Sequence, residues 1–287
     1  MALKLGACWH HLESCGSTSD ELLLRGRAGA AEGTVVTADA QDRGRGRLGR
    51  TWFSPPGENL YLSVLLRPPL APPRTPFLTL CAGVALAEAA TAVLAMPPAR
   101  PADSAAPLGE PAAPPADRAA PPIAQLKWPN DLLLGRRGGP LRKAGGILTE
   151  LVCSGGRVDF VVIGVGVNLN CLSFPPELIA TSLRAMLPPP APPLSVRDFA
   201  TRLLAHLQDR YEQFLAAGPG PILRAFESHA DYLGQPAPIT VHTGDRVLSG
   251  TPVGLADDGA LLVRDAAGQL HQVVAGEIIN PLTAAAR

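Results

Sequence analysis

The sequence predicts an α+β fold, in which a β-sheet with flanking helices is followed by a small C-terminal β-barrel. Short apolar runs bounded by turn signals recur between residues 34 and 167, which is typical of sheet strands. A long amphipathic pattern after Ser195, with apolar residues four apart, predicts a helix that packs on the sheet. From Pro236 onward, short alternating runs separated by turn signals predict an antiparallel barrel of roughly 45–50 residues.

The predicted elements follow a simple order along the chain. A Ser-Thr-Ser cap with acidic residues after it predicts a helix that begins at residues 17–19 and ends near Gly29. Predicted strands then occupy residues 34–40, 60–67, 123–128, 146–153 and 158–167, and predicted helices occupy residues 76–95, 177–187, 195–217 and 221–233. The mixed residues 1–16 show no periodic pattern and receive no predicted element.

Residues 97–122 differ in composition from the rest of the chain. Nine of these 26 residues are proline and nine are alanine, and they show no apolar periodicity. Such a segment cannot bury enough apolar surface to offset the entropy that it would lose on ordering, so we expect a disordered surface insertion. We therefore expect a main domain over residues 1–234, interrupted by this insertion, and a C-terminal domain over residues 235–287.

Charge and cysteine usage narrow the class of protein. The 25 basic and 25 acidic residues balance, so no overall field favours nucleic acid or a membrane surface. Five cysteines without a CxxC pair, and an N-terminus without a signal-peptide pattern, predict a cytoplasmic protein with reduced thiols. Residues 77–96 are long and apolar enough to resemble a membrane span, but Glu88 at their centre favours a core helix.

The sequence QDRGRGRLGR at residues 41–50 lies between two predicted strands and holds four arginines and three glycines. Glycines let a loop adopt backbone angles that other residues avoid, and they let ligand atoms approach the main chain. Guanidinium groups grip carboxylate and phosphate oxygens with paired donors. The loop therefore predicts a site for a small anion. An RNA-binding Arg-Gly segment and a solvated surface loop stay open as alternatives at this point.

Other motifs follow this loop in a fixed order. They are NLYLS at residues 59–63, KWPND at 127–131, KAGGILTE at 143–150 and GVGVNLN at 164–170. With this ordered set, the chain resembles the bacterial biotin protein ligase family. The resemblance implies a mixed β-sheet with helices on its faces, of the type shared with lipoate ligases and related to class II aminoacyl-tRNA synthetases. It also implies a C-terminal β-barrel like that of SH3 domains.

The resemblance implies a reaction as well. Enzymes of this family join biotin to ATP, with Mg²⁺, as biotinyl-5′-AMP, and then pass biotin to a carrier-domain lysine. The expected partner is the biotin carboxyl carrier protein domain of acetyl-CoA carboxylase or of a related biotin carboxylase. Many members carry an N-terminal DNA-binding domain, but here the catalytic pattern starts almost at Met1, so we expect no DNA binding. We expect no membrane association either, and either a monomer or a homodimer.

The family's functional residues map onto this sequence as follows. The implied catalytic residues are Arg47, Lys143 and Asp131. The implied biotin contacts are Ser17, Thr18, Gln41, Gly44, Arg45, Arg47, Lys143, Gly146 and Leu148. The implied ATP and adenylate contacts are Arg47, Arg50, Trp52, Asn130 and Asn168. Asp131, or Asn130 beside it, is the candidate for binding Mg²⁺ or for orienting the incoming lysine.

Plain structural roles compete with some of these assignments. Lys127 fits a solvated strand residue as well as a site residue, Trp128 fits the core, and Asn170 fits a turn better than a ligand contact. Two other functions also stay open. One is a lipoate or other acyl ligase of the same superfamily, and the other is a non-enzymatic RNA-binding protein that uses the Arg-Gly loop.

Overall fold

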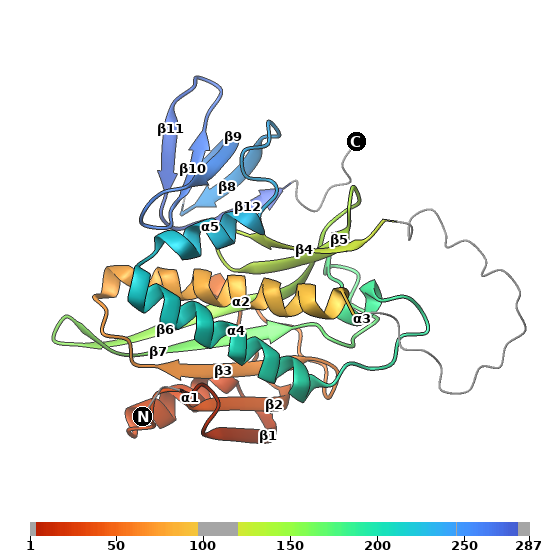
Figure 1. Cartoon of the computed structure of the whole chain (residues 1–287), viewed down its shortest axis with the longest axis vertical. Coiled ribbons are helices and arrows are strands. Elements are labelled where there is room, and N and C mark those ends of the chain that lie inside the picture. The colour runs from red at the N-terminus through yellow and green to blue at the C-terminus, as the bar shows by residue number, and fades with distance from the viewer. Residues whose placement is uncertain (1–3, 97–119, 245, 281–287) are drawn as a thin grey trace, which may run out of the picture.

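A seven-stranded mixed sheet forms the centre of the main domain, with its strands in the order β1-β2-β3-β7-β6-β5-β4 (Figure 1). These strands are β1 (Trp9–Cys15), β2 (Val35–Gln41), β3 (Leu60–Leu66), β4 (Pro122–Lys127), β5 (Asp131–Arg136), β6 (Arg142–Ser154) and β7 (Arg157–Val167). β1 pairs with β2 in parallel, and the other neighbouring pairs of this sheet are antiparallel. The mixed sheet that the family resemblance implies is therefore confirmed.

The computed structural model describes residues 4–96, 120–244 and 246–280. The proline- and alanine-rich segment that we predicted to be a disordered insertion, residues 97–122, therefore lies outside the described residues except for its last three. β4 begins at the last of them, Pro122.

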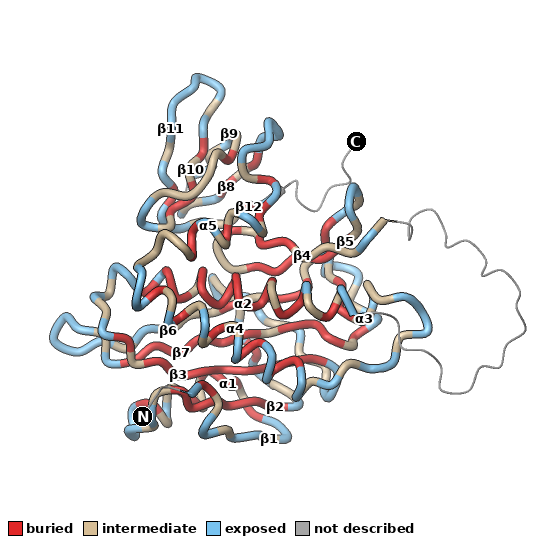
Figure 2. The backbone as a smooth tube through the Cα atoms, viewed as in Figure 1, coloured by how far each residue is buried: buried red, intermediate tan, exposed pale blue. Residues whose placement is uncertain are grey.

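The middle of the sheet is buried on both faces. Every residue of β3 is buried (Figure 2). Because successive strand residues point to opposite faces, β3 contributes side chains to two apolar clusters. On one face, Val64 packs in the large cluster with α2 (Pro76–Leu94) and α4 (Val196–Ala217). On the other face, Leu65 packs with Leu22 of α1 (Thr18–Arg27). The face under α1 is the one that carries the pocket described below.

α2 is the central helix of the large core. Together with the short turn before it, residues 72–94 are long and apolar enough to cross a membrane by length and composition alone. Most of the helix is nevertheless buried against the sheet and α4, which confirms our prediction of a core helix. Its central Glu88 forms an ion pair with Arg210 of α4, and a ring nitrogen of His206 lies 3.4 Å from the same carboxylate.

The C-terminal residues form a second, five-stranded antiparallel sheet in the order β11-β10-β9-β8-β12. Its strands are β8 (Ile239–Thr243), β9 (Arg246–Leu255), β10 (Leu261–Arg264), β11 (Leu270–Val273) and β12 (Glu277–Asn280), and α5 (Gly220–Ser228) leads into it. Its inner residues Val241 and Val263 join the same apolar cluster as α2. The indole nitrogen of Trp128 donates to the carbonyl of Gly259 at 3.0 Å. The C-terminal sheet is therefore fixed to the main domain by packing and by hydrogen bonds.

Besides β5, which was not among the predicted strands, three details of the sequence prediction were wrong. Residues 9–15 form the edge strand β1, although their largely polar sequence shows no strand pattern. The helix predicted at 177–187 is reduced to α3 (Leu183–Met186), because the backbone of residues 179–181 pairs with Lys143 of β6 instead. The last predicted helix ends at Ser228 rather than near Leu233.

Candidate active site

One cavity of about 270 Å³ lies over β6 and β7, on the face of the sheet opposite α2. Its walls come from the N-terminus of α1, the loop at residues 42–53, the turn at 128–131, residues 174–180 and Glu277 of β12. All the predicted site residues line this cavity except Gly44, whose carbonyl accepts from the amide of Trp52 at the base of the loop. The fold therefore gathers residues that lie far apart in the sequence.

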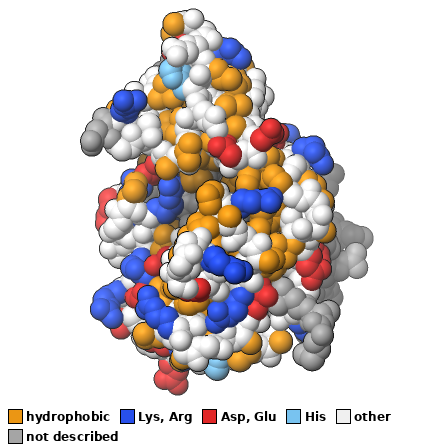
Figure 3. Space-filling view, turned by 90° about the vertical axis from the view of Figure 1, so that its left-hand side faces the viewer, with side chains coloured by type: hydrophobic (Ala, Val, Ile, Leu, Met, Phe, Trp, Pro, Cys, Tyr) orange, Lys and Arg blue, Asp and Glu red, His pale blue; other side chains and the backbone are white. Residues whose placement is uncertain are grey.

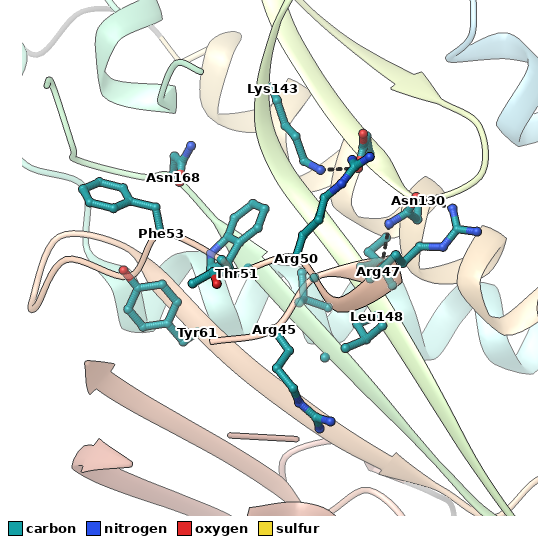
Figure 4. A pocket seen from close by; sticks show the side chains of 18 of the residues that line it. Arg45, Arg47, Arg50, Thr51, Phe53, Tyr61, Asn130, Lys143, Leu148 and Asn168 are labelled. Carbon is teal, nitrogen blue, oxygen red and sulfur yellow. Dashed lines mark hydrogen bonds and ion pairs between the residues drawn. The ribbon is translucent and has the colours of Figure 1, made fainter. Parts of the chain in front are cut away.

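Basic side chains concentrate locally although the whole chain is neutral. On the face of the molecule shown in Figure 3, Lys and Arg side chains lie beside and below a hollow under the C-terminal sheet, and apolar side chains form its floor. Figure 4 shows the cavity itself from close by, with Arg47, Arg50 and Lys143 on the same side of it as Asn130. An anionic group that enters this space meets positive charge, as the loop sequence predicted.

Each arginine of the loop that lines the cavity is held by a different part of the structure. Arg47 donates to the side-chain oxygen of Asn130 at 3.1 Å and to the carbonyl of Gly276 at 3.2 Å. Arg50 forms two hydrogen bonds of 2.6 Å with the carboxylate of Glu277. Because Asn130 belongs to the main domain and the other two partners to the C-terminal domain, the loop bridges the two domains.

Arg45 lines the cavity and also makes two ion pairs that the sequence did not predict. Its guanidinium pairs with Asp20 of α1 at 2.6 Å and with Glu150 of β6 at 3.0 Å. Figure 4 shows the side chain pointing away from Lys143. The side chain of Arg45 therefore ties the loop to α1 and β6 at the edge of the cavity that it lines. Leu48 is the exposed tip of the loop and takes a left-handed conformation with φ 57°.

A buried carboxylate between two ammonium groups forms the charged wall of the cavity. Asp131 is 5% exposed, and its two oxygens lie 2.6 Å from the Nζ of Lys143 and 3.1 Å from the Nζ of Lys127. Burial alone would raise the pKa of Asp131, but the charges of Lys143 and then Lys127 outweigh burial and lower it. Lys127 also donates to the carbonyl of Ile278, so it is a partner of the site and not a solvated strand residue.

The donor set at Asp131 bears on the predicted Mg²⁺ site. The described residues contain no group of three or more His, Cys, Asp or Glu side chains that could hold a metal ion. Both oxygens of Asp131 already contact ammonium groups, so an ion bound there would compete with two positive charges. Magnesium is commonly held by one or two carboxylates together with substrate phosphates and water. The residues therefore fit an ion carried on nucleotide phosphates better than an ion held by the protein alone.

The indole of Trp52 covers two glycines that face each other on neighbouring strands. Gly146 of β6 pairs with Gly166 of β7, and a Cβ atom on Gly166 would lie 2.6 Å from the indole. The Nζ of Lys143 lies 5.5 Å from the centre of the Trp52 ring. The buried indole nitrogen has no hydrogen-bond partner among the described residues. This arrangement gives the cavity an apolar floor directly beside its positive charges.

The far end of the cavity is polar and carries no net charge. Gln41 Oε1 accepts from the backbone amide of Thr18 at 2.9 Å and from its hydroxyl at 3.2 Å. Ser63 of β3 lies behind them, with its hydroxyl 2.9 Å from that of Thr18 and 3.0 Å from that of Ser19. The cavity therefore has three zones: a hydroxyl and amide end, an apolar floor and a cationic side.

Sequence reasoning missed several residues of the site. Ser19, Glu277 and Phe174 line the cavity, and Ser63 lies directly behind its lining. The NLYLS motif contained Ser63, so its alternation along the strand was a usable signal. Nothing local in the sequence points from Glu277 to the Gly-Arg loop. Asn168 lines the cavity as predicted, but its side-chain amide donates to the carbonyl of Thr181.

The fold and the cavity define an α+β domain whose cavity can accommodate an anionic small molecule with an apolar body and a polar, uncharged end. Residues 6–168 match the model of the biotin/lipoate A/B protein ligase family, and residues 233–279 match the biotin protein ligase C-terminal domain. The chain belongs to the biotin/lipoate A/B protein ligase family.

Relatives among characterised proteins agree with this assignment. A biotin–[acetyl-CoA-carboxylase] ligase of Mycobacterium tuberculosis is 31% identical over 288 residues, covering 96% of this chain and 91% of the relative. The bifunctional ligase/repressor BirA of Bacillus spizizenii is 33% identical over 243 residues, which is 83% of this chain but only 64% of the relative. This chain therefore spans about two thirds of the length of that bifunctional relative.

Solved structures show the same fold. A biotin protein ligase from Aquifex aeolicus in complex with biotin and ATP superposes with a TM-score of 0.72, at 24% identity, over 95% of this chain and 98% of that chain. A biotin protein ligase from Leishmania major in complex with biotinyl-5-AMP gives a TM-score of 0.55 at 27% identity, over 94% and 99% of the two chains. The SH3-like C-terminal unit that the resemblance implied is part of this shared fold.

Proposed function

We propose that this protein is an ATP-dependent biotin protein ligase, which activates biotin as biotinyl-5′-AMP and transfers it to a lysine of a carrier domain. One observation carries the proposal: a single cavity joins a hydroxyl and amide end, an apolar floor and a cationic side. Biotin has the matching parts in the same order, namely a ureido ring, an apolar chain and a carboxylate. The names of the relatives and the ligands in the solved structures support the same substrates.

The first half-reaction joins two anions, the biotin carboxylate and the α-phosphate of ATP. A carboxylate oxygen attacks the α-phosphorus, and pyrophosphate leaves with the electron pair of the bond that breaks. Lys143 and Arg47 line the cavity and offset the repulsion, and positioned charges of this kind stabilise the developing charge on phosphoryl oxygens. Mg²⁺ bound to the nucleotide would neutralise the phosphates further. Burial lowers the pKa of Arg47. The negative charges of Asp131 and then Glu277 act in the opposite direction and offset only part of this effect.

The second half-reaction transfers biotin to an amine. The neutral ε-amine of the acceptor lysine attacks the carbonyl carbon of the mixed anhydride, and the bond from that carbon to the phosphate oxygen breaks as AMP leaves. The proton that the nitrogen loses passes to the phosphate of AMP or to water. Because the pKa of Asp131 is lowered, this carboxylate is a weak base. Its role is to orient the incoming amine and to stabilise the positive charge that grows on the attacking nitrogen.

The acceptor and the setting of the enzyme belong to the same proposal. We infer that the carrier domain of acetyl-CoA carboxylase, or of a related biotin carboxylase, supplies the acceptor lysine, in line with the name of the mycobacterial relative. We also infer a cytoplasmic location and an activity without DNA or membrane, as a monomer or a homodimer.

Pyrophosphate release from ATP tests the proposal. The purified chain is incubated with Mg-ATP and either biotin, lipoate or no acid, and a biotinylation assay with an apo carrier domain follows. We expect pyrophosphate release that depends on biotin and a carrier domain that becomes reactive toward streptavidin. Pyrophosphate release with lipoate but not with biotin would instead identify a lipoate ligase of the same superfamily. Binding of a short RNA without either activity would favour the RNA-binding alternative.

A further inference from the structure

The hydroxyl groups at the polar end of the cavity form a chain whose hydrogen-bond direction is fixed by the backbone. The amide of Thr18 can only donate, so the atom of Gln41 that it contacts at 2.9 Å must be the oxygen Oε1. The Thr18 hydroxyl lies 3.2 Å from the same oxygen and must donate to it as well. The orientation of the Gln41 side chain therefore follows from one backbone donor.

The rest of the chain follows from the single hydrogen that each hydroxyl carries. The Thr18 hydroxyl already donates its hydrogen to Gln41. In the 2.9 Å contact between Thr18 and Ser63 the donor is therefore Ser63. Because Ser63 donates its own hydrogen to Thr18, the donor in the 3.0 Å contact between Ser63 and Ser19 is Ser19. The hydrogen bonds run from Ser19 to Ser63 to Thr18 to Gln41.

This direction determines what the cavity offers to a ligand. Ser19 lines the cavity, and with its hydrogen turned toward Ser63 its oxygen presents only lone pairs. Thr18 also lines the cavity, and its oxygen keeps one lone pair after accepting from Ser63 and donating to Gln41. The polar end therefore presents hydrogen-bond acceptors at two neighbouring positions.

The sheet leaves space for Ser19 in the required position. A Cβ atom on Gly164 would lie 2.5 Å from the Ser19 oxygen, so a larger residue there would displace the hydroxyl. Gly164 is the direct strand partner of Ser63 on β3. Ser63 itself is fully buried and does not line the cavity, so it acts on a ligand only through Ser19 and Thr18.

We propose that Ser63 is a positioning residue that sets substrate specificity: it holds Ser19 as an acceptor for a ring N–H donor of the ligand. This inference rests on the proposed function. A cyclic urea carries two N–H donors, whereas the dithiolane ring of lipoate carries none. Removal of the Ser63 hydroxyl frees the Ser19 hydrogen, and the fixed acceptor facing the cavity is lost.

Biotin binding to Ser63→Ala tests the proposal, with two biotin analogues as probes. In each analogue an oxygen replaces one ring N–H, so the cyclic urea becomes one of the two cyclic carbamates. We expect Ser63→Ala to weaken biotin binding about three- to tenfold, the range of one neutral hydrogen bond, with the KM for ATP unchanged. For the carbamate that lacks the N–H facing Ser19, the variant and the wild type should bind equally well. A double variant with Ser19→Ala should bind biotin no more weakly than Ser19→Ala alone.

A matched control removes one hydroxyl of another hydrogen-bonded pair, on the opposite face of the sheet. Thr79 and Thr149 share a hydrogen bond of 2.8 Å that joins α2 to β6 on the opposite face, so Thr79→Val should leave biotin binding unchanged. If Ser63→Ala fails to fold, Ser63→Cys carries the same test, since a thiol is a weak donor and acceptor. Biotin binding equal to wild type, or an equal loss for biotin and both carbamates, would overturn the role of Ser63. A wild type that binds no biotin would overturn the proposed function itself.

Discussion

Arg50 and Glu277 are 227 positions apart in the chain and form two parallel hydrogen bonds of 2.6 Å. Arg50 ends the Gly-Arg loop, and Glu277 begins the last strand of the C-terminal sheet. The hydrogen bond from Arg50 lowers the pKa of Glu277, so the pair is ionised in both partners at neutral pH. The C-terminal domain thereby sets the position of a loop that lines the cavity of the main domain.

Exchanging the charges of Arg50 and Glu277 tests whether the pair positions the loop for activity rather than stabilising the fold. Arg50→Glu alone places two carboxylates together, and we expect at least a tenfold loss of biotin-dependent pyrophosphate release. The double variant with Glu277→Arg restores opposite charges, so it should regain part of the lost activity. The Arg50 side chain is 62% exposed, so the free energy of unfolding should change by less than about 1 kcal/mol, measured by urea titration. Equal activity of the single and double variants would show that the pair does not position the loop.

Arg47 and Lys143 should matter for chemistry far more than another arginine of the same loop. We expect Arg47→Ala and Lys143→Ala each to lower kcat for pyrophosphate release about 100- to 1000-fold, as for other positioned charges. Arg43→Ala is the matched control, because Arg43 packs against Gly16 outside the cavity lining. Steady-state kinetics with saturating biotin and ATP provides the measurement. If all three variants lose activity equally, the loop acts as a whole and the individual assignments fail.

Gly166→Ala should displace the indole of Trp52 from the floor of the cavity. The added Cβ would lie 2.6 Å from two indole atoms, which is too close for the ring to remain. We expect at least a tenfold loss of biotin affinity in calorimetry, together with a shift in tryptophan fluorescence. Gly83→Ala in α2 is the control, because the nearest atoms would lie 3.6 Å away and alanine favours a helix by about 1 kcal/mol. That variant should keep full affinity and gain stability.

Asp131→Asn should destabilise the protein at neutral pH and change its response to acid. Removal of the charge between two lysines should cost about 3 kcal/mol of unfolding free energy. The pKa of Asp131 is lowered in the folded state, so its contribution is fully present above the unfolded value of about 3.9. The contribution is lost as the pH falls through the lower folded value. Denaturant titrations of wild type and variant should therefore converge below about pH 4. Asp39→Asn, at an exposed contact of 3.3 Å with a ring nitrogen of His11, should show no comparable effect.

Local periodicity predicted most of the fold. The central strands, α1, α2 and α4 appear where apolar spacing placed them, because burial on the sheet faces imposes that spacing. The side chain of Ser195 caps α4 as predicted, whereas the side chain of Ser17 makes no capping hydrogen bond with α1. β1 was missed because an edge strand that pairs on one side only can keep a polar sequence. The residues expected around the cavity came from ordered motifs, and the fold brings nearly all of them together.

The partners of charged side chains could not be predicted from the sequence. The loop arginines looked like free anion-binding groups, yet Arg45 pairs with Asp20 and Glu150, and Arg50 pairs with Glu277. Such pairs depend on how strands from distant parts of the chain align, and no local pattern encodes them. Asp131 was identified by its motif, but its position between Lys127 and Lys143 required the structure.

Two of the contacts that join the catalytic region to β12 end on main-chain carbonyl groups. Arg47 donates to the carbonyl of Gly276, and Lys127 donates to the carbonyl of Ile278. Every residue type supplies a carbonyl, so neither contact depends on the chemistry of the acceptor's side chain. Packing still restricts both positions, because a Cβ atom at Gly276 would lie 2.6 Å from the carbonyl oxygen of His242 and Ile278 is buried in the core. Insertion or deletion of one residue between β11 and β12 is different, because it shifts the strand and moves both oxygens away from their donors. The connection between the domains is therefore sensitive to a change in loop length, even where the side chains stay the same.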